Sequence, residues 1–314
     1  MSQHNALPEG LWPVMITPFT SSYQLDLGGL EKITRYYIDG GSNGLFANCL
    51  SSEMFQLTDD ERILLTQKVL EFSAGQVPVV ATGTFTRDQS KNADFIKRIY
   101  DTGVQAVILI TSMLVEPDEN EAILKSRLEY LMQQTGDIPL GVYECPVPYK
   151  RLLSPDLMKW MADSGRFIYH KDTSCHSGAI DRKAKAIAGS AFGFYNADTT
   201  TALDSLDSGG RGISPISGNF YIEPYTYLLK AYKEDGRTEA LNRLHAVLTA
   251  MDRITHSFYP YSAKLFLQRR GMKIEAVTRI PHETLSNVDH LRLHALSDSL
   301  QLLSELYGFP LLRF

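Results

Sequence analysis

Short hydrophobic runs alternate along the chain with longer stretches in which apolar residues recur at helical spacing. A short apolar run bounded by turn-forming residues is typical of a buried strand, whereas spacing of three and four residues predicts an amphipathic helix. Strand-like runs are expected at residues 11–16, 45–47, 77–81, 106–110, 138–143, 167–170, 192–195 and 211–214. Eight strands that alternate with helices indicate an α/β protein of the (β/α)8 TIM barrel class.

Polar residues and glycines mark the ends of the expected helices. Residues 58–61 and 86–89 each have the pattern of a capping box, and Ser154 precedes a proline at the first helical position. Gly40 and Gly41 are expected to end the helix before the second strand. These boundaries support the alternation of strands and helices independently of the hydrophobic pattern.

The pattern changes after the eighth expected strand. The remaining chain has helical spacing only, interrupted at Gly236, Gly271 and Pro281. We therefore predict a barrel that carries the site over residues 8–236 and a helical C-terminal domain over residues 237–314.

The composition is that of a folded protein with a small-molecule partner. Of the 314 residues, 44% are hydrophobic, and the net charge of -5 comes from 31 basic and 36 acidic residues scattered along the chain. Because there is no run of like charge and no long apolar segment, nucleic acid and membranes are not expected partners. Cys49, Cys145 and Cys175 are odd in number and widely spaced, so we expect reduced thiols and a cytoplasmic protein.

Lys171 directly follows the apolar run 167–170 and precedes turn-forming residues. It is therefore expected at the carboxyl end of the sixth strand, where α/β barrels carry their chemistry. Burial disfavours the ammonium form and lowers the pKa of a lysine, so that a neutral amine can attack a carbonyl carbon. Taken alone, the position also fits a lysine whose head group stays in water.

Two further strand ends carry groups that complement an amine. Tyr143 ends the fifth strand, and a phenol beside Lys171 can relay protons while an imine forms. After the second strand, the hydroxyls of Ser51 and Ser52 and the amides of their loop can bind a carboxylate. Each residue taken singly fits a structural role, as a rim tyrosine or a helix cap, whereas the combination favours a site.

The expected strand ends also carry a series of short motifs. These are Thr17-Pro18-Phe19, Ser51-Ser52-Glu53, Thr82-Gly83-Thr84, Tyr143 with Pro146, Lys171-Asp172-Thr173-Ser174 and Gly209-Gly210-Arg211-Gly212-Ile213-Ser214. Over nearly the whole chain, this order resembles the dihydrodipicolinate synthase/N-acetylneuraminate lyase family of Schiff-base aldolases. The resemblance implies a barrel with a three-helix C-terminal appendage, a homo-oligomer (dimer or tetramer), and a lyase that needs neither a cofactor nor a metal.

The same resemblance implies roles for individual residues. Lys171 would form a Schiff base with pyruvate or a related 2-oxo acid, and Tyr143 would be the proton shuttle. Ser51 and Ser52 fall in the loop that binds the substrate carboxylate, and Ile213 lies near the carbonyl side of the pocket. The iminium would accept electrons, so that a carbon–carbon or carbon–oxygen bond is made or broken. An aldolase, a dehydratase and a synthase are the alternatives.

The chain departs from the synthase of this family at several places. Leu50 stands where the family's loop has a hydroxyl, Met113-Leu114 where the synthase has a tyrosine pair, and Pro148 where it has an arginine. We therefore expect a protein other than an authentic dihydrodipicolinate synthase, with a more apolar pocket mouth. Lys150 and Arg151 are expected as solvated loop charges, with a substrate-binding cation as the alternative.

Other hypotheses stay open at this point. Glu144 either binds sugar hydroxyls or anchors its loop. A barrel that has lost catalysis would be a 2-oxo-acid-binding or regulatory protein. A metal enzyme that uses the cysteines or His170 is disfavoured, because no His/Asp/Glu cluster has ligand spacing along the sequence.

Overall fold

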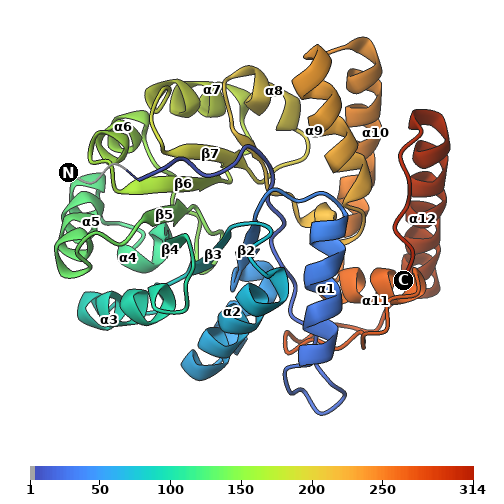
Figure 1. Ribbon diagram of the computed structural model, residues 1–314, viewed down its shortest axis with the longest axis horizontal. Coiled ribbons are helices and arrows are strands. Elements are labelled where there is room, and N and C mark those ends of the chain that lie inside the picture. Colours follow the sequence, from blue (N-terminus) through green and yellow to red (C-terminus); the bar gives the residue numbers. More distant parts are fainter. Residues whose placement is uncertain (1–3) are drawn as a thin grey trace.

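In the computed structural model, which describes residues 4–314, eight strands form one sheet that curls into a barrel (Figure 1). The strands are β1 (Gly10–Leu11), β2 (Leu45–Ala47), β3 (Val79–Thr82), β4 (Ala106–Ile110), β5 (Leu140–Tyr143), β6 (Phe167–Asp172), β7 (Gly193–Asn196) and β8 (Gly212–Ile213). Every pairing is parallel, and the hydrogen-bonded order is β1-β8-β7-β6-β5-β4-β3-β2. The predicted (β/α)8 barrel is confirmed.

The first strand is shorter than the hydrophobic pattern predicts. Instead of a strand over 11–16, the chain has β1 and then an isolated parallel bridge between Val14 and Phe46. Pro13 lies between them and lacks an amide hydrogen, so it can only accept a hydrogen bond, which Phe46 donates at 3.0 Å. This bridge joins β1 to β2 and completes the ring.

Helices connect the strands and surround the sheet (Figure 1). Those before Gly236 are α1 (Leu27–Asp39), α2 (Asp59–Ser73), α3 (Gln89–Tyr100), α4 (Thr111–Leu114), α5 (Glu121–Gln134), α6 (Pro155–Asp163), α7 (Ser177–Ala186), α8 (Ala202–Asp207) and α9 (Glu223–Asp235). After it come α10 (Glu239–Thr255), α11 (Tyr261–Arg269) and α12 (Asn287–Tyr307). The C-terminal helices expected from the sequence are therefore present, and the domain boundary after residue 236 remains our proposal.

Side chains at the helix starts explain most of these boundaries. Thr58 and Glu61 form the predicted capping box of α2, and the Ser154 side chain accepts the Leu157 amide at the start of α6. The capping box predicted at 86–89 is wrong. Asp88 is the N-cap of α3, because its carboxylate accepts the first free amides of the helix, and a carboxylate suits this position well.

Two hydrophobic clusters fill the molecule. The larger one lies between the sheet and the helices and includes residues of α10, α11 and α12, so that the barrel and the C-terminal helices share one core. The smaller one contains side chains of alternating strand positions; in it Tyr169 stacks on Tyr195 with ring centroids 4.6 Å apart, and Trp12 packs against both. This packed interior closes the barrel below the strand ends.

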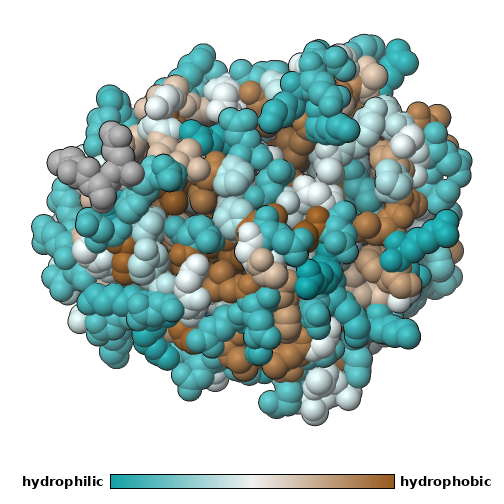
Figure 2. All heavy atoms as spheres, viewed as in Figure 1, coloured by the Kyte–Doolittle hydropathy of each residue, from teal (hydrophilic) through white to brown (hydrophobic). Residues whose placement is uncertain are grey.

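The face of the molecule drawn in Figure 2 is mostly polar. Figure 2 shows hydrophilic side chains over most of one face, with smaller hydrophobic areas among them. Among residues 4–314, no helix has the length and apolarity required to cross a membrane.

Candidate active site

The strand register brings Tyr143 and Lys171 side by side. Tyr143 at the end of β5 pairs with Lys171 near the end of β6, and the Lys171 Nζ lies 4.6 Å from the centre of the tyrosine ring. The ring of Phe46 from β2 lies 5.9 Å from the same nitrogen. Lys171 is only 3% exposed. An amine and a phenol therefore share a largely apolar environment at the carboxyl end of the barrel.

The surroundings of Lys171 favour its neutral form. Within the described part of the chain, no carboxylate lies within 4.0 Å of its nitrogen. Burial lowers the pKa of Lys171 from 10.5 to about 8, and the nearby Cys49 and Cys145 thiols act weakly in the opposite direction. With such a pKa, roughly a tenth of the amine is unprotonated at neutral pH, whereas an ordinary lysine is almost entirely charged. A neutral amine is the form that a nucleophilic lysine requires.

A cavity of about 430 Å³ opens above these two residues. Its walls come from the loops after β2, β5, β6, β7 and β8, from the end of α10 and from the segments that follow α10 and α11. The lining residues are Leu50, Ser51, Tyr143, Pro146, Val147, Lys150, Lys171, Thr173, Cys175, Ala197, Asp198, Ile216, Asp252, His256, Tyr259, Pro260 and Ile280. The volume is in the range typical of small-molecule sites.

Of the expected substrate-binding residues, only Ser51 lines this cavity. The Ser52 hydroxyl donates to the Met15 carbonyl at 2.6 Å and accepts the Cys49 amide at 3.1 Å, so it fixes the shape of the loop. Ile213 is 1% exposed and packs in the larger hydrophobic cluster. The side chains of Ser52 and Ile213 therefore have structural positions behind the site.

The residues that distinguish this chain from the synthase also separate in space. Leu50 lines the cavity, whereas Leu114 is fully buried in the larger cluster and Met113 packs against the smaller one. Leu50 puts an apolar side chain where a hydroxyl was expected to act. A hydroxyl is therefore missing from this position of the cavity wall.

The cavity mouth is more polar than the sequence predicted. Lys150, Asp198, Asp252 and His256 all line it, beside the expected apolar residues. Lys150 is exposed, as expected of a solvated loop charge, and its Nζ also donates to the Thr173 carbonyl at 2.8 Å. The expectation of an apolar mouth is therefore corrected to a mixed one.

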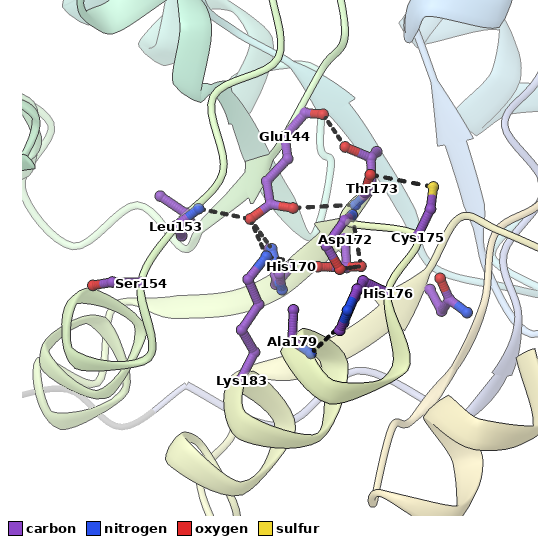
Figure 3. A network of polar contacts seen from close by, with 12 residues as sticks. Glu144, Leu153, Ser154, His170, Asp172, Thr173, Cys175, His176, Ala179 and Lys183 are labelled. Atoms are coloured by element: carbon purple, nitrogen blue, oxygen red, sulfur yellow. Dashed lines mark hydrogen bonds and ion pairs between the residues drawn. The ribbon is translucent and has the colours of Figure 1, made fainter. Parts of the chain in front are cut away.

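Glu144 is buried behind the site in a network of charges (Figure 3). Lys183 of α7 donates to Glu144 at 2.5 Å and to Asp172 at 2.8 Å, and the His170 ring lies 3.5 Å from Glu144. Burial opposes ionisation of Glu144, but His170 and Lys183 hold its pKa below the usual value. Glu144 also accepts the amides of Leu153 at 2.8 Å and Thr173 at 3.1 Å. Of the two alternatives for Glu144, binding of sugar hydroxyls and anchoring of the loop, these contacts support anchoring of the loop.

The fold does assemble a His/Asp/Glu cluster that the sequence spacing hid. Ligand atoms of Glu144, His170 and Asp172 lie within 4.8 Å of one another. The Lys183 ammonium bonds to both carboxylates. It supplies the positive charge between the two carboxylates, so the geometry is that of a buried ion-pair network.

Several residues of the site come from helices that the sequence analysis did not connect to it. Asp252 of α10 and His256, which caps the end of that helix, form a pair at 3.0 Å, and Thr199 after β7 donates to Asp252 at 2.8 Å. Contact with Asp252 raises the pKa of His256. Behind the β2 loop, Glu53 forms a buried ion pair with Lys264 of α11 at 2.6 Å. Their spacing in the sequence gives no signal, because only the packing of the C-terminal helices brings them to the barrel.

Comparison with known proteins places this geometry in a family. A model described as the dihydrodipicolinate synthetase family matches residues 7–299. The chain belongs to this family. The 4-hydroxy-tetrahydrodipicolinate synthase of Shewanella piezotolerans is 23% identical over 286 residues, which cover 91% of this chain and 96% of that protein. The enzyme of the same name from Methanospirillum hungatei is 25% identical over 239 residues, which cover 76% and 80%.

Solved structures related to the dihydrodipicolinate synthetase family have the same fold. A monomeric dihydrodipicolinate synthase variant superposes with a TM-score of 0.85 at 22% identity, covering 95% of this chain and 98% of its own. The synthase of Thermotoga maritima gives 0.84 at 22% identity, with 94% and 99% covered. A prophage protein of the family from E. coli K12, solved in complex with pyruvate, gives 0.83 at 22% identity, with 95% and 100% covered.

Proposed function

We propose that this protein is a Schiff-base-forming lyase of the class I aldolase type, which acts on pyruvate or a related 2-oxo acid. The observation that carries the proposal is the buried Lys171 nitrogen, without a carboxylate partner among residues 4–314, beside the Tyr143 ring and open to the cavity. Family membership supports the same chemistry, and the E. coli relative solved with pyruvate supports the substrate class.

The proposed reaction begins when the neutral Lys171 amine attacks the C2 carbonyl of the 2-oxo acid. Tyr143 gives a proton to the hydroxyl of the carbinolamine, which leaves as water, and the iminium remains. The iminium withdraws electrons from C3. Cleavage of the C3–C4 bond, with loss of the C4 hydroxyl proton, leaves an enamine and an aldehyde, and attack of the enamine on an aldehyde is the reverse of this step. Alternatively, loss of a proton from C3 gives the enamine, and the C4 hydroxyl then leaves as water to give an unsaturated product; in each case the Tyr143 phenolate is the proposed proton acceptor. The Lys171 nitrogen is cationic in the iminium and becomes neutral when it accepts the electron pair in the enamine, so these steps require no other electron sink.

We further propose that the chain is not an authentic dihydrodipicolinate synthase. The hydroxyls expected of that enzyme's proton relay are absent from this chain. Leu50, which lines the cavity, and Met113-Leu114, which pack in the hydrophobic clusters, occupy their positions. Pro148 does not line the cavity, so the loop after β5 presents Lys150 in place of the expected arginine. These substitutions support a different second substrate.

Trapping with borohydride tests the proposed function. Incubation with pyruvate and borohydride should reduce the imine to a stable adduct, and peptide mapping should place it on Lys171. Lys264 is an internal comparison: burial also lowers its pKa to about 8, but it is ion-paired with Glu53 and does not line the cavity. Lys171→Ala and the longer Lys171→Met should abolish the adduct and retain the native circular dichroism spectrum.

Other outcomes would redirect the proposal. An unmodified Lys171 after exposure to pyruvate would contradict it. An adduct without turnover of any 2-keto-3-deoxy acid would favour the alternative of a catalytically impaired 2-oxo-acid-binding or regulatory protein. Turnover that EDTA abolishes, with no adduct, would indicate a metal enzyme.

A further inference from the structure

The segment between α10 and α11 places a second phenol at the cavity. Tyr259 lies in this segment, is partly buried and lines the cavity, as Tyr143 does. Its ring stacks on Phe220 with ring centroids 6.3 Å apart, and its oxygen accepts a hydrogen bond from the Asn219 side chain at 2.6 Å. These two contacts fix the position of the hydroxyl. Tyr143 has a role in the proposed reaction, whereas Tyr259 has none so far.

The contacts of Asn219 show that Tyr259 accepts from it and does not donate to it. The Asn219 side-chain nitrogen also donates to the Val14 carbonyl at 2.9 Å, and the side-chain oxygen accepts from the Tyr37 hydroxyl. A carbonyl can only accept, so the nitrogen end of the amide faces both Val14 and Tyr259. The single hydrogen of the Tyr259 hydroxyl therefore has to be donated to another group.

The Ser51 hydroxyl lies beside that of Tyr259 at the cavity. Ser51 belongs to the loop after β2, for which carboxylate binding is expected. Burial raises the pKa of Tyr259 well above its usual value, whereas contacts with Ser51 and Asn219 act in the opposite direction. The phenol thus stays protonated at neutral pH. Two neighbouring hydroxyls can each donate a hydrogen bond to one oxygen of a carboxylate.

The other hydroxyls of the cavity wall have different partners or roles. Within residues 4–314, the wall residues with a hydroxyl are Ser51, Tyr143, Thr173 and Tyr259. Thr173 donates its hydrogen to the Glu144 carbonyl at 2.6 Å (Figure 3). Tyr143 is the proposed proton shuttle. Ser51 and Tyr259 are therefore left as neutral donors for a ligand.

The charged side chains of the cavity do not replace these donors. The carboxylate of a 2-oxo acid is bonded to the carbon that forms the imine, so it has to lie close to the Lys171 nitrogen. Lys150 and His256 also line the cavity, but both are exposed, and water weakens the attraction of an exposed cation. Asp198 and Asp252 line it as well and oppose an anion. An anion that is buried without hydrogen-bond donors is strongly destabilised.

We propose that the Tyr259 hydroxyl, together with Ser51, binds the carboxylate of the 2-oxo acid while Lys171 holds the imine. The proposal rests on the proposed function, because the imine is what brings the carboxylate to these hydroxyls. It makes the segment between α10 and α11 part of the substrate-binding site. It also makes a free carboxylate beside the ketone a requirement for tight binding.

The test separates binding from chemistry in one variant. Tyr259→Phe keeps the ring on Phe220 and removes the hydroxyl, and the rate of borohydride-trapped adduct formation on Lys171 is measured against pyruvate concentration. Loss of a hydrogen bond to a charged group predicts half-saturation at roughly ten- to hundredfold higher pyruvate, with little change in the rate at saturation. 2-Butanone has an ethyl group in place of the carboxylate, so its half-saturation should be the same in both proteins.

Tyr221→Phe is the matched control, because Tyr221 is a fully buried tyrosine that does not line the cavity, and its variant should keep the half-saturation for pyruvate. An unchanged half-saturation for Tyr259→Phe would overturn the proposal, as would an equal loss for pyruvate and 2-butanone. Equal half-saturation for the two ketones in the unmodified protein would overturn it without any variant. Absence of any pyruvate adduct on Lys171 in the unmodified protein would instead contradict the proposed function.

Discussion

Lys171 and Lys264 are both buried lysines at the carboxyl end of the barrel, yet their nitrogens have different neighbours. Burial lowers the pKa of each to about 8. Lys264 donates to Glu53 and to the Val277 carbonyl, both at 2.6 Å, so its ammonium is held in an ion pair. Lys171 has aromatic rings and an open cavity beside it. Burial is thus combined with an ion pair at Lys264 and with an open cavity at Lys171, which is why we propose only Lys171 as the nucleophile.

The phenol of Tyr143 gives a prediction at this scale. Tyr143→Phe removes the proton donor for carbinolamine dehydration but keeps the ring against Lys171, so imine formation should slow by roughly two to four orders of magnitude. Stopped-flow trapping with pyruvate measures the rate. Tyr169→Phe is the control, because Tyr169 is a buried barrel tyrosine outside the cavity lining, and its variant should react at a near-normal rate. A near-normal rate for Tyr143→Phe would remove the tyrosine from this role.

At the scale of elements, α7 fixes the ends of β5 and β6 against each other. Its Lys183 reaches Glu144 after β5 and Asp172 at the end of β6, and Glu144 in turn accepts amides on both sides. Tyr143 directly precedes Glu144, and Lys171 directly precedes Asp172. The ion-pair network thus determines how the phenol and the amine face each other.

Removing Lys183, the central cation of this network, should destabilise the folded protein. Lys183→Met would leave two buried carboxylates without their cation, and we expect the free energy of unfolding to fall by about 3–5 kcal/mol. Lys185→Met, on the same helix, removes only an exposed pair with Asp181 and should change it by less than about 0.5 kcal/mol. Urea denaturation of both variants measures the difference. Similar midpoints for the two would mean that the network contributes little to stability.

The sequence predicted the strands and the residues at their ends better than the contacts made by the helices. The apolar runs predicted the barrel because buried parallel strands consist of such runs, and the strand ends predicted Lys171 beside Tyr143 because consecutive strands are neighbours in this fold. The first strand is shorter than predicted because Pro13 has no amide hydrogen to donate. The hydrophobic pattern of the sequence does not show this absence. Lys183 lies 39 residues from Glu144, and His256 follows α10 and pairs with Asp252 of that helix, so no pattern at the strand ends could assign them to the site.

In the molecule as a whole, the barrel and the C-terminal helices are joined by a common core and by the buried pair of Glu53 and Lys264. Glu53 also accepts the hydroxyl of Thr278 and the amides of Arg279 and Ile280 after α11, so one carboxylate fixes this segment over the β2 loop. Residues of α10 complete the cavity wall. The proposed domain over residues 237–314 is therefore a structural unit that depends on the barrel.

This dependence predicts that the chain unfolds in one step. Near-ultraviolet and far-ultraviolet circular dichroism should give the same thermal midpoint, because losing the shared core exposes both parts together. Lys264→Met should lower this midpoint for both probes equally, since it leaves Glu53 buried without its cation. Two resolved transitions would show that residues 237–314 unfold on their own.

The wall supplied by α10 has a consequence for how specificity could diverge among relatives. In the proposed enzyme, the reactive nitrogen of Lys171 belongs to the barrel, whereas part of the cavity wall belongs to α10 and the segments that follow it near the C-terminal end of the chain. Substitutions in that part of the chain, or its exchange in a chimaera, should therefore change which substrates bind. The proposed catalytic residues of the barrel would stay the same.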